Sequence, residues 1–204
     1  MAVSDFLVRR SWLLRTAIAM PLLAAALVGC GTSAKNNTYD LSATATGSGP
    51  SAKGRQILVQ LPTALKPLDS DQIVVRVSPS EIQYLAKAQW GDKLPRMVQA
   101  KLVQAYENSG KLTGVGIPGQ GLAIDYQVVT DIRAFEVRAG NGSQAVVEIS
   151  AKILNDRNGS VRTQKVFRQA VPAGGGSNDG YVKALDRAFS AVASQIVDWT
   201  LRSI

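Results

Sequence analysis

The residue with the most distinctive chemistry is Cys30, the single cysteine of a 204-residue chain that contains no histidine. A lone cysteine cannot form an internal disulfide, so it is an inert buried thiol, a reactive nucleophile or a site of covalent modification. Catalysis has little support, because histidine is the usual base for a serine or cysteine nucleophile. The residues that precede Cys30 decide among these three roles.

The first 29 residues have the three zones of a secretory signal peptide. A start that carries Arg9, Arg10 and Arg15 precedes the uncharged run Thr16–Gly29. This run has 14 residues, whereas a membrane-spanning helix needs about 20. We therefore predict that residues 1–29 form a signal peptide and not a transmembrane anchor. The arginine pair leaves both the general and the twin-arginine export routes open.

Leu27, Val28 and Gly29 precede Cys30 in a pattern that resembles a bacterial lipobox. The resemblance implies that the thiol receives diacylglycerol and that the signal peptide is cut just before Cys30. It also implies that a fatty acid such as palmitate then acylates the new amino group. The residue after Cys30 is Gly31. In enterobacteria, an aspartate at this position retains a lipoprotein in the inner membrane, so the glycine favours the outer membrane.

Residues 30–54 are rich in Ser, Thr, Gly, Ala and Asn and contain few large apolar side chains. Such a segment buries too little apolar surface to fold alone. It predicts a lipidated, flexible tether that reaches about 80 Å when fully stretched. Tyr39-Asp40-Leu41 is the one island within it that could dock as a short strand. We expect a single folded domain over residues 55–204.

Strand patterns open this domain at residues 56–62 and 72–78, with a short candidate at 81–86. Alternating apolar residues then predict a three-strand meander between residues 122 and 171. The alternation slips between Ile132 and Phe135, which predicts a β-bulge. Asn141-Gly142 and Asn158-Gly159 predict the two hairpin turns, with the first of type I′.

Two segments have the period of amphipathic helices, residues 91–110 and residues 181–202. Asp92 is the expected N-cap of the first helix, and Gly110 is its expected end. Helices and antiparallel strands in this order predict an α+β fold. We expect an antiparallel sheet with both helices packed on one of its faces.

Two further patterns suggest cofactor or metal chemistry, and neither has the right context. A dinucleotide-binding glycine loop leads from a strand into a helix. Here the GxGxxG pattern leads into a strand and follows a helix; its glycines are Gly114, Gly116 and Gly119. A metal site made of carboxylates alone is unusual for zinc. The carboxylates that share one strand are Asp125, Asp131 and Glu136. We interpret them as a solvated sheet face and predict no catalytic, cofactor-binding or metal-ligating residue.

The chain carries a formal net charge of +8. Removal of residues 1–29 takes away three arginines and Asp5 and leaves 20 basic and 14 acidic side chains, a net charge of +6. A basic balance can indicate nucleic-acid binding. An exported lipoprotein does not meet nucleic acid in its normal setting, and the charges are scattered. The surplus instead favours anionic lipid or an acidic partner.

Tyr84, Trp90 and Pro95 are the candidate partner-contacting residues, because exposed aromatic residues often anchor interfaces. They lie in and directly after the segment that leads into the first helix. An alternative assigns Trp90 to the core, where it would seal the start of that helix. The spacing of the three residues leaves both interpretations open.

Three stretches together resemble the ABC-type transport auxiliary lipoprotein family, the PqiC-like lipoproteins. They are VVRVSPSEIQYLAKAQWGDKLPRMVQAKLVQAYENSG, DYQVVTDIRAFEV and ALDRAFSAVASQIVDW. The positions that carry the resemblance are Tyr39-Asp40-Leu41, Tyr84, Trp90, Leu94-Pro95, Tyr126, Asp131, Phe135 and Trp199. The resemblance implies a non-enzymatic, periplasm-facing lipoprotein. Its partners would be an MCE-type substrate-binding protein, an ABC permease and an ATPase, and some relatives form homo-oligomeric rings.

The sequence therefore predicts a lipid-anchored docking subunit of an envelope lipid transporter. A second hypothesis is a carrier that holds an acyl chain between helix and sheet. A third is an outer-membrane assembly lipoprotein that binds a β-barrel protein. An enzyme is the remaining alternative, and no residue spacing argues for it.

Overall fold

The computed structural model describes residues 36–42, 47–140, 142–174 and 176–204. The predicted signal peptide, the lipobox residues Leu27, Val28 and Gly29, and Cys30 lie outside the described residues, as does Asn141. Within the described ranges, no helix combines the length and the hydropathy that a membrane span requires.

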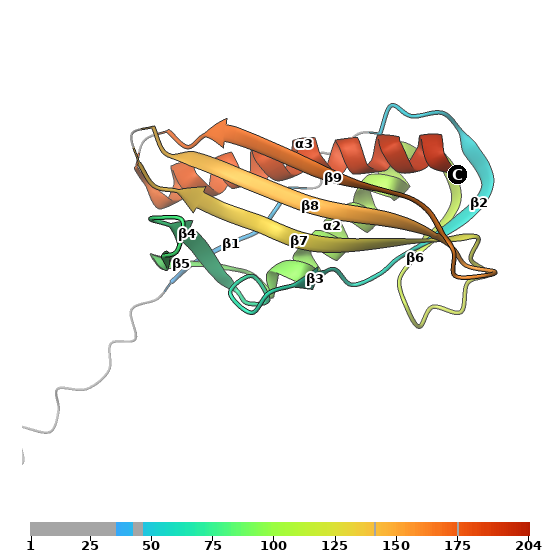
Figure 1. Cartoon of the computed structure of the whole chain (residues 1–204), viewed down its shortest axis with the longest axis horizontal. Coiled ribbons are helices and arrows are strands. Elements are labelled where there is room, and N and C mark those ends of the chain that lie inside the picture. Colours follow the sequence, from blue (N-terminus) through green and yellow to red (C-terminus); the bar gives the residue numbers. More distant parts are fainter. Residues whose placement is uncertain (1–35, 43–46, 141, 175) are drawn as a thin grey trace, which may run out of the picture. The chain divides into compact units, whose positions relative to one another are not determined.

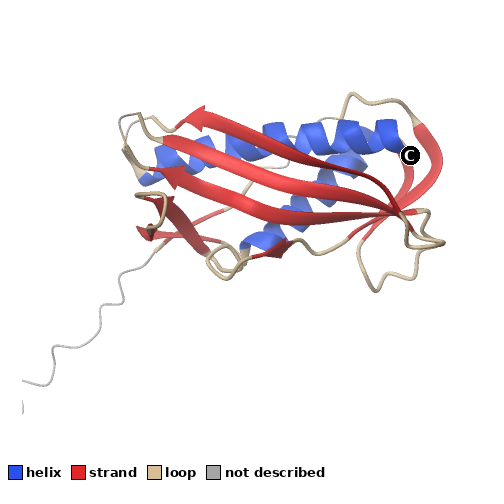
Figure 2. Ribbon diagram, in the orientation of Figure 1, coloured by secondary structure: helices blue, strands red, loops and turns tan. Residues whose placement is uncertain are grey.

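The chain forms two helices and nine strands in the described ranges, which confirms the α+β class (Figures 1 and 2). The helices are α2 (Leu94–Ser109) and α3 (Asn178–Ser203). The strands are β1 (Asn37–Tyr39), β2 (Ala52–Val59), β3 (Thr63–Ala64), β4 (Gln72–Arg76), β5 (Ile82–Trp90), β6 (Leu112–Gly116), β7 (Tyr126–Arg138), β8 (Gln144–Asn155) and β9 (Val161–Pro172).

Strand β7 organises the sheet. Along one side it pairs with β8 in antiparallel fashion over its whole length, and β9 continues the meander. Along its other side it pairs in succession with β2, β3 and β4, all in parallel. The expected antiparallel sheet is thus wrong in part, and the sheet is mixed. Tight turns join only antiparallel neighbours, whereas β2, β3 and β4 reach β7 through long connections that include α2.

The predicted bulge in β7 is confirmed, because its register with β8 shifts between Ile132 and Ala134. The shift lets Ile132 and Phe135 both face the core, where each is 1% exposed. The first hairpin is longer than a two-residue type I′ turn, since Arg138 pairs with Gln144. Gly159, in the second hairpin, has a φ of 67°, which suits glycine.

The core lies between the sheet and the helices. Helix α3 packs against β7, β8 and β9, and α2 packs against β2, β6 and α3. In the view of Figure 2, both helices lie behind the strands. The Phe135 ring contacts Trp90 and Phe189 of α3, with centroids 5.7 and 5.9 Å apart. The inward positions of β8 are fully buried: Ala145, Val147, Ile149, Ala151 and Ile153.

The helix ends differ in detail from the sequence prediction. The N-cap of α2 is Lys93 and not Asp92, whose carboxylate instead accepts a hydrogen bond from the Lys93 amide at 2.7 Å. Gly110 ends this helix as predicted, in the left-handed conformation. Helix α3 starts before residue 181 because the Ser177 hydroxyl caps it, accepting a hydrogen bond from the Gly180 amide at 3.1 Å.

The folded unit begins at Asn36 and not near residue 55. The reason is a strap, residues 36–42 and 47–51, that lies along α3. Within it, β1 pairs with β5, and Leu41 is 2% exposed. The composition of this segment resembles that of a tether, but its small polar groups bind side chains of the helix. Residues 36–42 and 47–54 of the predicted 30–54 tether therefore belong to the folded unit.

Three aspartates of α3 hold the strap. Asp198 accepts hydrogen bonds from the Ser48 and Gly49 amides at 2.6 and 2.9 Å. Asp186 accepts hydrogen bonds from the amide and the hydroxyl of Ser42 at 2.7 and 2.8 Å. The third contact is between the Tyr39 hydroxyl and Asp179 at 2.6 Å, and this hydrogen bond raises the pKa of Tyr39.

Candidate functional site: an arginine-lined hollow on the outer face of the sheet

One face of the sheet points away from α3, and we call it the outer face. Phe135 contacts α3, so its neighbour Glu136 points to the opposite side of β7. Directly paired residues on adjacent strands share a face. The row that contains Glu136 runs across five strands: Tyr84, Val74, Glu136, Val146 and Ala170. The next row contains Ile82, Arg76, Arg138, Gln144 and Pro172.

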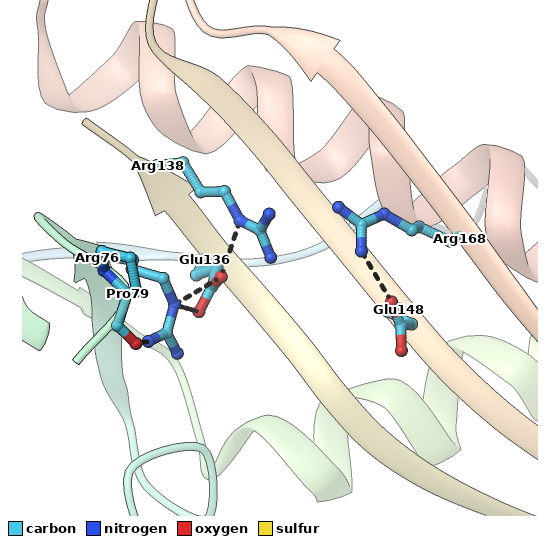
Figure 3. Close-up of polar contacts among 6 residues, drawn as sticks. All are labelled: Arg76, Pro79, Glu136, Arg138, Glu148 and Arg168. Carbon is cyan, nitrogen blue, oxygen red and sulfur yellow. Dashed lines mark hydrogen bonds and ion pairs between the residues drawn. The ribbon is translucent and has the colours of Figure 1, made fainter. Parts of the chain in front are cut away.

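Glu136 is the centre of an ion-pair network on this face (Figure 3). The Arg76 Nε donates to both of its carboxylate oxygens, at 2.8 and 2.9 Å. The Arg138 Nε donates to the Oε1 atom at 3.0 Å. Glu136 is 2% exposed. A buried charge is costly unless it is paired, and these two guanidinium groups compensate the charge of Glu136. The hydrogen bond to Glu136 raises the pKa of Arg76, and the Arg76 Nη1 also donates to the Pro79 carbonyl at 3.2 Å.

A second ion pair joins the next two strands, β8 and β9. The Arg168 Nη1 on β9 donates to the Oε2 atom of Glu148 on β8 at 3.0 Å. The row that carries this pair also contains Ala134, because Ala134 pairs with Glu148 and Glu148 pairs with Arg168. All three residues therefore share the outer face with Glu136.

The network borders an open hollow of about 560 Å³. Its walls include Arg76, Arg133 and Arg138, together with the turn at Pro79, and Ala134 contributes to its floor. Counting Arg168, four arginines face three carboxylates here, because Asp131 pairs with Arg133 at 3.5 Å beside Glu136 and Glu148, so the region keeps a small positive surplus. No described residue pairs with the two terminal nitrogens of Arg138. Guanidinium groups bind carboxylates and phosphates through two parallel hydrogen bonds, so this surface can bind an oxyanion.

The structure separates the three predicted partner-contacting residues. Tyr84 lies on the outer face and is 44% exposed. Trp90 is 1% exposed, and Pro95 is buried in the first turn of α2. The partner-contact prediction is therefore wrong for Trp90 and Pro95, and the core interpretation holds for Trp90. The cause is an irregularity in β5, where Lys87 has a φ of 58° and the register with β4 shifts, so that the strand turns Trp90 to the face opposite Tyr84.

The three carboxylates expected on a solvated face have different environments. Asp131 is partly exposed and accepts a hydrogen bond from Thr63 at 2.8 Å. Asp125 accepts one from the Gln56 amide at 2.9 Å. Glu136 is buried, which corrects the prediction for this residue. The spacing of Glu136 and Arg138, two positions apart on one strand, was the signal that could have indicated the pair.

The structure also places the glycine pattern. Gly114 and Gly116 belong to β6, which pairs with β2, and the chain then runs through a turn into β7. A strand thus follows these glycines, as the sequence predicts, and the geometry of a dinucleotide-binding loop is not formed. Among the described residues, no cluster of His, Cys, Asp or Glu has the arrangement of a metal site.

The fold and its outer face define a small α+β domain with an arginine-lined hollow on its surface. A family model described as the ABC-type transport auxiliary lipoprotein component matches residues 39–197. The match covers most of the chain, and the chain belongs to this family. This confirms the family resemblance that the sequence shows.

The chain is also similar to individual proteins. The uncharacterized protein bll6063 of Bradyrhizobium diazoefficiens is 28% identical over 184 residues, which cover 87% of this chain and 48% of that protein. The chain thus spans about half the length of that curated relative. The crystal structure of protein XCC0632 from Xanthomonas campestris, of the DUF330 family, is 28% identical with a TM-score of 0.77, covering 82% of this chain and 95% of that one. A crystal structure of an uncharacterized protein shares the fold at 15% identity with a TM-score of 0.66, covering 81% of this chain and 99% of that one.

Proposed function

We propose that the protein is a lipid-anchored docking subunit of an ABC transporter that moves lipids or other hydrophobic molecules across the cell envelope. Family membership over residues 39–197 carries this proposal. The structure supports a docking role because the outer face is an open, polar and arginine-lined surface. In this account the subunit is not catalytic and needs no cofactor beyond its covalent lipid.

The anchor in this account is Cys30, modified with diacylglycerol and an N-linked fatty acid. Several acyl chains act together, because each buried CH₂ contributes about 0.8 kcal/mol. The first residue of the folded unit, Asn36, is six positions beyond Cys30, and such a stretch spans at most about 20 Å. The strap would thus keep the domain near the membrane, on the periplasmic side and, given Gly31, of the outer membrane.

The proposed partners are an MCE-type substrate-binding protein, an ABC permease and an ATPase. The domain cannot move far from the membrane in which it is anchored. The partner is therefore expected to extend to the anchored domain. Assembly into a homo-oligomeric ring remains part of the proposal. No nucleic acid is expected as a partner.

The lipid-carrier alternative needs an apolar cavity between helix and sheet. That interface is instead occupied by side chains with 0% exposure, among them Ile149, Phe189 and Ile196. The filled interface favours docking over carrying. Mass spectrometry of the purified chain tests the difference, because a carrier would retain a lipid. The outer-membrane assembly alternative differs only in its partner, a β-barrel protein.

Affinity purification of the full-length protein from its own envelope, with mass spectrometry of the bound proteins, tests the proposal. We expect an MCE-type protein together with a permease and an ATPase. The Cys30→Ser variant serves as the control for membrane attachment, and we expect it to fold but to remain in the soluble fraction. Recovery of a β-barrel protein without transporter subunits would favour the assembly alternative.

A further inference from the structure

The guanidinium groups of Arg138 and Arg168 point toward one another over β8 (Figure 3). Within the described part of the chain, Arg138 pairs with Glu136 and Arg168 pairs with Glu148. Both arginine side chains are substantially exposed, at 40% and 49%. Two positive charges that face each other repel, so a ligand that brings negative charge next to both arginines is favoured here.

The residues already present indicate which anion suits the gap. Both arginines pair with carboxylates of the chain itself, Glu136 and Glu148. A phosphate dianion would concentrate two negative charges at one point next to these glutamates, whereas the carboxylates of an extended segment place single charges several Å apart. Carboxylate is therefore the better match for a surface whose surplus positive charge is small.

Three features indicate that the carboxylate belongs to a protein segment. The hollow is open along the sheet, and the turn at Pro79 forms one of its walls. Tyr84, a 44% exposed aromatic residue, lies in the same row as Glu136 and extends the surface beyond the arginines. Exposed tyrosine and arginine residues are the types that dominate protein interfaces.

We propose that the outer face binds an acidic segment of a partner protein, with Asp or Glu side chains seated between Arg138 and Arg168. Strands β7 and β9 are two ladder spacings apart, about 10 Å. Arg138 is level with Pro172, four positions along β9 from Arg168, so the two side chains approach each other obliquely across β8. Two acidic residues at alternate positions of an extended segment are about 7 Å apart, so the long arginine side chains can reach both. The inference names the chemistry of the docking surface and rests on the docking function proposed above.

A peptide titration tests this inference. The probe is the peptide Glu-Ala-Glu-Ala-Glu-Ala, and Gln-Ala-Gln-Ala-Gln-Ala is its uncharged match. The protein is the mature chain with Cys30→Ser, isotopically labelled for NMR. We expect the acidic peptide to shift the amide signals of β8 and β9 with saturation, and the glutamine peptide to leave them unchanged. Equal shifts with both peptides would overturn the proposal.

Variants make the test specific. Arg168→Gln should weaken binding by about tenfold or more, the usual size of one charged hydrogen bond. Arg96→Gln removes the same charge from an exposed position on α2 and should leave binding unchanged. Glu148→Gln should strengthen binding, because it removes the internal competitor for Arg168. Weaker binding in Glu148→Gln, or an equal loss in Arg96→Gln, would contradict the assigned site.

Two further titrations separate the sources of negative charge. Inorganic phosphate should displace the bound peptide only when the phosphate concentration is well above the peptide concentration. Vesicles that contain phosphatidylglycerol should not shift the β8 signals. A site that prefers phosphate, or that responds to vesicles alone, would replace the acidic segment with a phosphate ligand or a membrane. The titration needs no transporter, so its failure is distinguishable from a failure of the affinity purification.

Discussion

Arg76 and Glu136 join strands β4 and β7 through a two-point contact, in which the Arg76 Nε donates to both carboxylate oxygens. The two residues are 60 positions apart in the chain. The contact lies next to the hollow and reinforces the parallel pairing of β4 with β7. Strand β4 has only five residues, so backbone pairing alone offers few hydrogen bonds there. It therefore links the fold of the domain to the shape of its candidate binding surface.

The Glu136→Gln variant should be less stable by about 1–3 kcal/mol, because it removes a buried charged acceptor of two arginines. Partial exposure of Arg76 and Arg138 keeps the loss below that of a fully buried pair. Urea unfolding followed by circular dichroism measures the change. Glu148→Gln is the matched control, since Glu148 is 21% exposed and has one arginine partner. An equal loss in both variants would contradict the central role of Glu136.

Thr130 offers a prediction of the opposite sign. Its side chain is 1% exposed on β7, and its hydroxyl has no hydrogen-bond partner among the described residues. Thr130→Val keeps the shape and removes the unsatisfied hydroxyl, so it should stabilise the domain by about 1 kcal/mol. The same change at Thr163, which is half-buried on β9, should have little effect. A destabilised Thr130→Val variant would mean that the hydroxyl has a partner.

Tyr106 predicts how stability depends on alkaline pH. Its hydroxyl is buried against the Thr200 hydroxyl at 2.7 Å, and burial raises the pKa of Tyr106 above its ordinary value of 10.0. Below pH 10 both the folded and the unfolded chain keep this proton. Above pH 10 the unfolded chain loses it first, so folding stability should fall as pH rises, by up to about 1.4 kcal/mol per pH unit.

Urea titrations at pH 8 and pH 11 check this dependence. Tyr106→Phe should be less stable at pH 8, because Thr200 loses its partner, but it should lose less stability between the two pH values. Tyr84→Phe is the control and should keep the slope of the original chain. An unchanged slope in Tyr106→Phe would show that other groups cause the alkaline loss.

The strap gives a prediction about local stability. Asp198→Ala removes the acceptor of the Ser48 and Gly49 amides, and Gly49→Ala would place a Cβ atom 2.8 Å from the Leu201 Cβ. Both variants should increase hydrogen exchange at residues 47–49 by about tenfold or more, while amides in β8 stay protected. Glu107→Ala, an exposed carboxylate on α2, is the control. Unchanged exchange in Asp198→Ala would mean that the clamp does not hold the strap.

Local sequence patterns were sufficient for much of this fold. Periodicity indicated both helices and the β7–β8–β9 meander, and the slip between Ile132 and Phe135 indicated the bulge, because these features depend on neighbouring residues. The parallel pairing of β7 with β2, β3 and β4 could not be predicted in this way, since contacts between distant segments determine it. The strap had the composition of a flexible tether, and its packing is explained by the positions of Asp179, Asp186 and Asp198 on α3 and by the pairing of β1 with β5.

The candidate site was harder to predict for the same reason. Arg76, Glu136 and Arg168 come from three strands and meet only when the mixed sheet forms. Tyr84 and Trp90 lie six positions apart, which in a regular strand places both side chains on one face. The irregular backbone at Lys87 puts them on opposite faces, and no local pattern indicated it.

Site-specific photo-crosslinking in the native envelope tests the central claim, that the protein docks a transporter component through its outer face. A photoreactive amino acid replaces Tyr84 on the outer face in one variant and Gln195, an exposed residue of α3, in the other. We predict a crosslink from position 84 to a subunit of an ABC lipid transporter and none from position 195. Crosslinks from position 195 alone, or from position 84 to a β-barrel protein, would contradict the account.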